Sequence, residues 1–197
     1  YTSGTTWHAA GLVAQLRATE NLTRLSRYSL ELYQKLEAET GQATGFRAPG
    51  AISVASTPER FTELQRTASM ARHLGVDAFA MSAEEVKRSW PDVEVGDLVG
   101  AVHIPDDAMV SPVDTTNALL AGARALGVQI RQRTPVTGLV IEAGRVVGVE
   151  TAEGAIRAEV VVLAAGLWSR DIAAPYGVTI PLHAAEHYYA ITEPIDD

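Results

Sequence analysis

The apolar run Val160-Val-Val-Leu-Ala-Ala-Gly166 constrains the fold of this chain more than any other stretch of its sequence. Side chains of a β-strand alternate between two faces, so a continuous apolar run needs cover on both. We therefore expect a strand that is buried on both faces and ends at Gly166. Together with the mixed strands and helices expected elsewhere in the chain, such a strand predicts an α/β or α+β protein.

Helical and extended patterns alternate along the rest of the chain. Apolar residues recur at helical spacing from Asn21 to Glu39, and Gly41 follows as a natural helix stop. Three further helix starts combine a hydroxyl N-cap with a proline or a glutamate, at Thr57-Pro58, Ser82-Ala-Glu-Glu85 and Ser111-Pro112. Strands are expected over residues 50–56, 98–104, 136–142, 145–151 and 183–192, the third and fourth as a hairpin.

The composition limits the classes of function. The chain has 197 residues, the length of one large domain or two small ones. Its hydrophobic fraction of 47% is ample for a packed core. Its net charge of -8 disfavours nucleic-acid and anionic-membrane partners, because phosphate binding relies on clustered positive charge. The absence of cysteine excludes disulfides, thiolate metal sites and cysteine nucleophiles. No membrane-spanning run or signal peptide is visible, so we expect a cytoplasmic protein.

His103, Asp106 and Asp107 are the residues that could suggest a metal site. No second histidine is placed to complete a typical zinc or iron ligand set, and adjacent acids in a loop are usually solvated. We therefore predict a solvated loop and no metal.

The segment most informative about a binding or catalytic role is Thr2-Ser-Gly-Thr-Thr-Trp-His-Ala-Ala-Gly-Leu-Val13. Its small and hydroxyl residues would let the backbone approach a planar ligand closely and bond its polar edge. A histidine in such a loop could be a ligand, a base or a nucleophile, or an incidental residue at a helix N-terminus. The chemistry of the residues alone leaves these alternatives open.

The eight residues Gly4-Thr-Thr-Trp-His-Ala-Ala-Gly11 closely resemble the flavin-attachment segment of the dimethylglycine and sarcosine dehydrogenases and related oxidases. These enzymes belong to the glycine oxidase and D-amino-acid oxidase type of flavoprotein. The resemblance continues through Leu32–Gly41, the strand from Gly50 and Ser111-Pro-Val-Asp114, and it reaches the end of the chain.

The resemblance implies FAD bonded covalently through His8. A neutral imidazole nitrogen is a competent nucleophile, and the bond to the flavin 8α carbon should raise the reduction potential. The residues expected to contact the cofactor from this segment are Thr5, Thr6, Trp7, His8, Ala9, Gly11 and Leu12.

Two later segments fit the same resemblance. In the family, a residue that matches Val136 meets the adenine through its backbone, and the apolar strand passes close to the dinucleotide. This adds Val136, Ala164, Ala165, Gly166 and Trp168 to the expected cofactor contacts. An ordinary core strand and turn is the alternative.

A Pro-Leu…His-x-Tyr pattern implies that His187 faces the substrate. Tyr189 would lie on the same face of a strand. A half-buried strand with a satisfied histidine is the alternative, and His183 has no family pattern to support it.

The resemblance also implies the domain organisation. Residues 1–48 and 105–176 would form part of a Rossmann-like FAD-binding domain, and residues 49–104 and 177–197 part of an antiparallel-sheet substrate domain. The family's Gly-x-Gly-x-x-Gly turn occurs nowhere in the sequence and would precede Tyr1. We therefore expect an internal fragment that is inactive alone.

The function implied is oxidation of an N-methylated glycine, such as dimethylglycine or sarcosine, by hydride transfer to covalently bound flavin. Some relatives pass the one-carbon product to tetrahydrofolate on a separate domain that this chain does not represent. The alternatives are a non-covalent FAD amino-acid or amine oxidase, and a catalytically silent, flavoprotein-like regulatory subunit.

Overall fold

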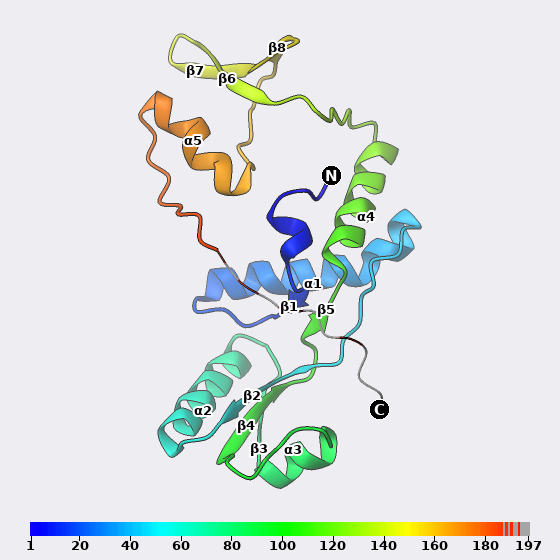
Figure 1. Ribbon diagram of the computed structural model, residues 1–197, viewed down its shortest axis with the longest axis vertical. Coiled ribbons are helices and arrows are strands. Elements are labelled where there is room, and N and C mark those ends of the chain that lie inside the picture. Colours follow the sequence, from blue (N-terminus) through cyan, green and yellow to red (C-terminus); the bar gives the residue numbers. More distant parts are fainter. Residues whose placement is uncertain (187, 189, 191–192, 194–197) are drawn as a thin grey trace. The chain divides into compact units, whose positions relative to one another are not determined.

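The computed structural model describes residues 1–186, 188, 190 and 193. The chain divides into two compact units, Tyr1–Ile130 and Arg131–Asp197. Every pairing between the described strands is antiparallel. The predicted mixture of helices and sheet is therefore confirmed, with antiparallel sheets in both units (Figure 1).

The first unit consists, in chain order, of η1 (Thr5–His8), β1 (Leu12–Val13), α1 (Glu20–Thr40), β2 (Ala51–Ala55), α2 (Pro58–His73), β3 (Phe79–Met81), α3 (Ala83–Ser89), β4 (Gly100–Ile104), β5 (Ala108–Met109) and α4 (Pro112–Ala125).

The helices begin where the capping patterns predict. The hydroxyl oxygens of Thr57 and Ser111 accept backbone N–H bonds at the starts of α2 and α4. Ser82 and Glu85 form the complete capping box of α3. The long helix α1 ends at Gly41, whose φ of 69° is the left-handed conformation that glycine adopts at low cost.

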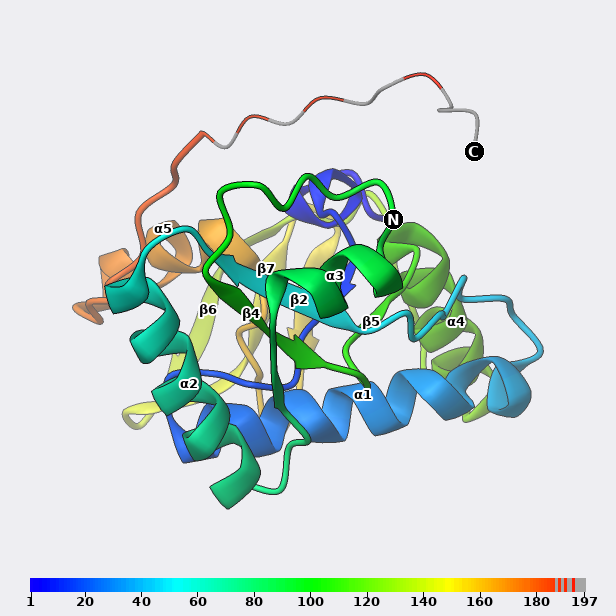
Figure 2. The ribbon, with the colours of Figure 1, turned by 90° about the horizontal axis from the view of Figure 1, so that it is seen from below.

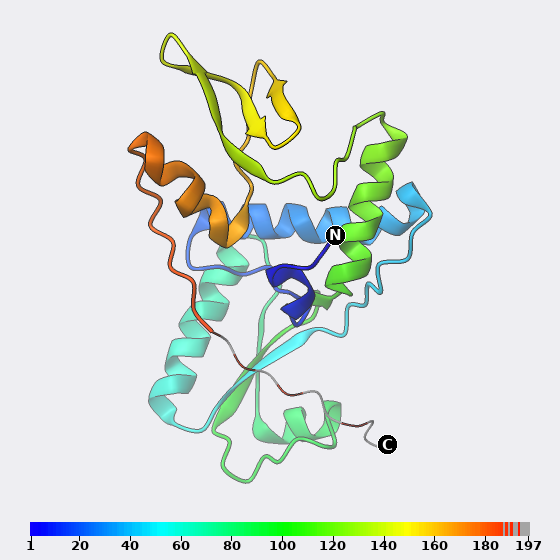
Figure 3. The same ribbon diagram turned by 45° about the horizontal axis from the view of Figure 1, so that its top comes forward.

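A three-stranded sheet in the order β2-β4-β3 forms the core of the first unit. Its register places His103 between Ile52 and Phe79. The helices α2 and α3 flank the sheet on opposite sides (Figures 1 and 3). The buried cluster under α2 consists of Ala55, Leu64, Ala68, Ala71, Val76, Ala78 and Val102. Strands β2 and β4 were predicted, whereas the three-residue β3 was not.

A second, smaller ladder joins the start of the chain to the segment before α4 (Figure 2). Strand β1 pairs with β5, and the backbone N–H of Val110 donates to the carbonyl of Gly11 at 2.9 Å. On its other side, Met109 exchanges two backbone hydrogen bonds with Arg47, at 2.9 and 2.8 Å. Gly11 has a φ of 79°, and a Cβ atom built on it would lie 2.0 Å from the Val110 carbonyl oxygen. Only glycine fits there.

The second unit contains β6 (Val136–Glu142), β7 (Arg145–Thr151), β8 (Gly154–Arg157), η2 (Gly166–Trp168), α5 (Ser169–Ala173) and η3 (Ala174–Tyr176). The predicted hairpin is confirmed: Ala143 and Gly144 both have positive φ, as a type I′ turn requires. Strand β8 extends the hairpin to three strands and was not predicted.

The predicted strand over Val160–Gly166 is wrong for this structure. Residues 160–165 form no regular element, and η2 begins at Gly166. Val160 and Val162 are 76% and 80% exposed rather than buried on two faces. A strand requires a neighbour that completes its hydrogen bonds. Within the described residues no strand lies alongside this run.

The strand expected over residues 183–192 is also absent from its continuously described part, because residues 183–186 are irregular.

We predict that Ser82→Ala lowers the free energy of unfolding by about 1 kcal/mol, since it removes the N-cap of α3. Urea unfolding followed by Trp90 fluorescence would measure the loss, because Trp90 is the C-cap of the same helix. Ser89→Ala, at the exposed end of α3, is the matched control and should be neutral. Equal effects of the two substitutions would contradict the capping assignment.

Gly11→Ala and Gly41→Ala separate backbone strain from crowding. Both glycines are left-handed, but a Cβ on Gly41 meets no atom within 4 Å. We expect Gly41→Ala to cost about 1 kcal/mol, from the conformational penalty alone. Gly11→Ala should cost about 3 kcal/mol, because the ladder to Val110 has to move as well. Thermal unfolding of both variants checks the difference, and indistinguishable Tm values would disprove the close contact.

Candidate functional site

His8 lies at the end of the short 3-10 turn η1, between the small-residue opening and strand β1. The ring centroids of Trp7 and His8 are 4.5 Å apart, with an angle of 46° between the planes. Both side chains are exposed, Trp7 by 54%. The turn therefore presents an indole and an imidazole side by side at the surface of the first unit.

The surroundings of η1 fix the turn in place. The backbone N–H of Ala9 closes the turn by donating to the Thr6 carbonyl at 3.1 Å. Helix α4 lies beside η1 (Figures 1 and 3). The guanidinium of Arg124, in the last turn of α4, lies 5.3 Å from the Tyr1 ring centroid and donates to its hydroxyl. The segment is thus held to α4 before the turn and to β5 after it.

The other residues expected to contact the cofactor from this segment lie in or next to the turn. Thr5 and Ala9 are exposed, and Thr6 is half-buried. Leu12 is 76% exposed although it belongs to β1. Gly11 is half-buried and packs directly on Val110. These five residues, with Trp7 and His8, all lie within residues 5–12, and five of the seven have exposed side chains.

Asp107 is a buried acid at the base of this segment, and its predicted solvation is wrong. Its side chain is 5% exposed, whereas Asp106 beside it is exposed. Its Oδ1 atom accepts the backbone N–H of Gln15 at 2.9 Å, and Gln15 is itself buried. No periodicity in the Pro105-Asp-Asp-Ala108 sequence distinguishes the buried acid from the exposed one.

Burial raises the pKa of the Asp107 carboxyl, and the Gln15 hydrogen bond and the positive charge of Arg17 oppose the rise. The folded protein therefore binds this proton more tightly than the unfolded chain does. The contribution of Asp107 to stability is then present at low pH and is lost as the pH rises through the folded-state pKa.

The second unit contains two adjoining cavities that involve the other expected cofactor residues. The larger, of about 590 Å³, is lined mainly by aliphatic side chains and by residues of the 161–165 segment, including Ala164 and Ala165. The smaller, of about 470 Å³, is lined by Trp168 among others. Val136 lines both. Gly166 lines neither, but its φ of 56° turns the chain between Ala165 and Trp168.

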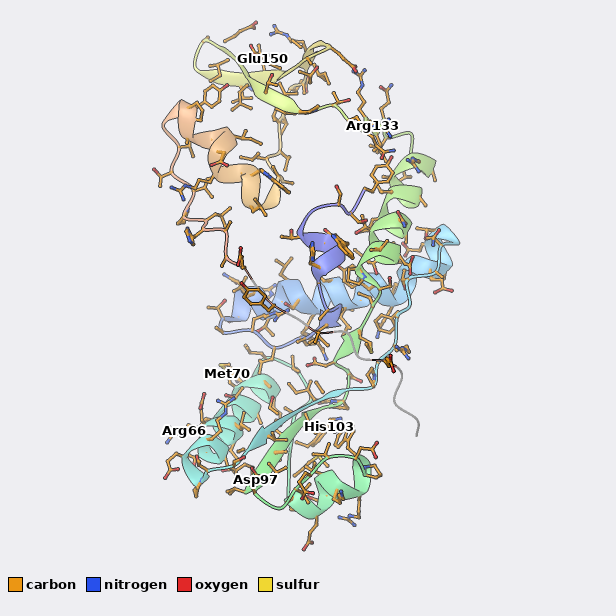
Figure 4. All side chains as sticks on the ribbon, viewed as in Figure 1. Arg66, Met70, Asp97, His103, Arg133 and Glu150 are labelled. Carbon is orange, nitrogen blue, oxygen red and sulfur yellow. The ribbon has the colours of Figure 1, made fainter. Side chains whose placement is uncertain are left out.

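Tyr176 fixes the strand that carries Val136, a role that the sequence analysis missed. Its hydroxyl accepts the backbone N–H of Leu139 at 2.6 Å. Gly138 leaves room for this contact, because a Cβ there would lie 3.1 Å from the Tyr176 hydroxyl and 3.0 Å from the carboxylate of Glu150, which Figure 4 labels on β7. The pairing of β6 with β7 is irregular between Val136 and Gly138. Tyr176 thus holds β6 directly after this irregularity.

His187 and Tyr189, the residues expected to face the substrate, lie outside the described residues. His183, the other histidine in this part of the sequence, is exposed in an irregular segment.

His103, labelled on β4 in Figure 4, packs its ring edge-on against Trp90, with 5.2 Å between the ring centroids. A Cβ atom built on Gly50 would lie 2.7 Å from the Nε2 atom of His103, so the imidazole occupies the space that a side chain at position 50 would need. Among the described residues, no three His, Asp or Glu side chains are grouped as a metal ion would need. In the same part of the chain, no helix is both long and apolar enough to cross a bilayer.

Taken separately, the residues of each unit are chemically suited to contact part of a flavin dinucleotide. An exposed imidazole beside an indole suits attachment to a flat aromatic ligand. The two cavities beside Val136 fall within the range of roughly 300–1,000 Å³ that is typical of small-molecule sites.

Known proteins resemble the chain along almost its whole length. It is 40% identical over 194 residues to the 4-methylaminobutanoate oxidase (formaldehyde-forming) of Paenarthrobacter nicotinovorans, covering 98% of this chain and 24% of that protein. It is 38% identical over 196 residues to the mitochondrial pyruvate dehydrogenase phosphatase regulatory subunit of Mus musculus, covering 98% and 22%. Identity to the mitochondrial sarcosine dehydrogenase of Homo sapiens is 37% over 201 residues, covering 99% and 22%. The chain thus spans less than a quarter of the length of these curated relatives.

The fold agrees with the sequence comparison. The crystal structure of L-proline dehydrogenase from P. horikoshii superposes with a TM-score of 0.83 at 27% identity, covering 89% of this chain and 46% of that one. The family described as DAO, FAD dependent oxidoreductase, matches residues 1–197. Since the match extends over the whole sequence, the chain belongs to the FAD dependent oxidoreductase family.

Proposed function

We propose that the protein containing this chain oxidises an N-methylated amino acid, such as sarcosine or dimethylglycine, with FAD bonded covalently to His8. The proposal concerns the whole protein, because the chain spans only 22–24% of its curated relatives.

The observation that carries the proposal is the exposed Trp7–His8 pair on η1, within a segment that matches the flavin-attachment pattern. The names of two relatives add support. One is named as a formaldehyde-forming oxidase of a methylamino acid, and the other as a sarcosine dehydrogenase. Both names describe substrates that carry an N-methyl group.

In this proposal, different residues of the chain would bind the flavin, hold the dinucleotide and position the substrate. The imidazole of His8 provides the nitrogen for the covalent bond, and the ladder from Gly11 to Val13 holds it in place. Val136, Ala164, Ala165, Gly166 and Trp168 would hold the dinucleotide in the second unit. His187 and Tyr189 would position the substrate amine or carboxylate. Bound FAD would supply the two-electron acceptor for hydride from the N-methyl carbon.

We predict that His8→Ala abolishes covalent flavin. Acid precipitation of the wild-type full-length protein should leave yellow colour in the pellet, whereas the His8→Ala pellet should be colourless. His73→Ala is the matched control, because His73 is an exposed histidine at the end of α2 and should leave the linkage intact. A colourless wild-type pellet would refute the covalent bond and favour a non-covalent FAD amine or amino-acid oxidase.

A second candidate function is a regulatory subunit without catalysis. The 38% identity to the phosphatase regulatory subunit favours it, because that relative covers the same residues as the oxidases do. Anaerobic addition of sarcosine or dimethylglycine to the full-length flavoprotein distinguishes the two. Bleaching of the flavin absorbance is expected for the oxidoreductase, and no bleaching by any N-methyl amine would leave the regulatory role as the better account.

A further inference from the structure

We propose that Asp107 is a positioning residue that fixes the His8 segment against the sheet β2-β4-β3. The role assigned to His8 rests on the proposed function, whereas the anchoring contacts of Asp107 do not.

Between the His8 turn and α1, a short ladder attaches the segment to β5. Strands β1 and β5 have two residues each, which is short for a stable ladder. The hydrogen bond between Val110 and Gly11 closes the end of this ladder nearer to His8. At the other end, the next contact is the hydrogen bond from the Gln15 N–H to Asp107.

Gln15 is 7% exposed and Asp107 is 5% exposed, so water cannot readily replace this hydrogen bond. Removing the carboxylate would leave a buried backbone N–H without an acceptor, which costs more than losing an exposed bond. Gln15 would then be driven toward solvent, and β1 would loosen from its far end.

The backbone of Asp107 is bonded to the ends of two strands of the sheet. Its carbonyl accepts the N–H of Gly50 at 3.0 Å, immediately before β2. Its N–H donates to the carbonyl of Ile104 at 3.4 Å, at the end of β4. The backbone of Asp107 therefore bonds to the residue before β2 and to the last residue of β4, and its side chain bonds to the segment that follows His8. The position of His8 relative to this sheet depends on that junction together with the contacts of the segment with α4 and β5.

The test uses Asp107→Ala and Asp107→Asn in the full-length protein, with two readouts. The first is the fraction of flavin that stays with the polypeptide after acid precipitation. The second is amide hydrogen exchange in peptides from residues 9–17, which needs no flavin. We expect Asp107→Ala to lose at least about fivefold in covalent flavin and to exchange at least about tenfold faster. Asp107→Asn keeps the acceptor oxygen and should match wild type in both.

Two controls separate positioning from general stability. Asp106→Ala changes the neighbouring exposed acid and should alter neither readout. Val86→Ala opens the buried side of α3 and should lower the Tm while leaving the flavin linkage intact.

Three results would overturn the inference. They are unchanged exchange in Asp107→Ala, wild-type covalent flavin in that variant, and an equal loss of flavin in Val86→Ala at the same Tm. Wild-type protein without covalent flavin would instead refute the proposed function. The exchange rates would then still decide whether Asp107 anchors the segment.

Discussion

The first unit depends on a few hydrogen bonds between residues 11–15 and residues 107–110, which are main-chain bonds except for the one accepted by the Asp107 carboxylate. The ladder is short, so its strength comes from its two ends, where Gly11 permits contact with Val110 and Asp107 accepts from Gln15. Met109 is bonded to Arg47 on the other side, which makes β5 the middle member of this arrangement. The start of the chain, the long helix α1 that follows it and the sheet β2-β4-β3 are thereby joined at one place.

The second unit uses a comparable device on a different scaffold. There a side-chain hydroxyl, that of Tyr176, reaches across to the backbone of β6 at Leu139. Gly138 is buried and has no side chain, which leaves space for the phenol. In each unit, a polar side chain far along the chain accepts a backbone hydrogen bond from the segment that carries an expected cofactor residue. Gln15 follows His8 by seven residues in one unit, and Leu139 follows Val136 by three in the other. Precise placement of such residues requires support of this kind.

Local signals made most of the regular elements predictable from the sequence. Caps at Thr57, Ser82 and Ser111 and the Ala143-Gly144 turn depend on neighbours within a few residues, and these elements lie where they were expected. The prediction of a strand over Val160–Gly166 was wrong because a strand depends on a distant partner, and the hydrophobicity of a segment does not reveal that partner. The prediction that Asp107 is solvated failed for the same reason, because its hydrogen-bond partner Gln15 lies 92 residues away in the sequence. His8 and its neighbours were identified by a family pattern, not by the physical properties of the loop.

The irregular pairing of β6 has a consequence for self-association. Strand β6 lies at one edge of its sheet, and its register with β7 shifts at two places. Thr137 is an extra residue on β6, and Val147 is an extra residue on β7. Such bulges twist a strand and interrupt the even spacing of its outward-facing N–H and carbonyl groups. A regular edge would be a template for a strand from another molecule, with the aggregation that follows. The irregularity at Thr137 in β6 therefore makes this edge of the hairpin a poor nucleus for intermolecular β-sheet.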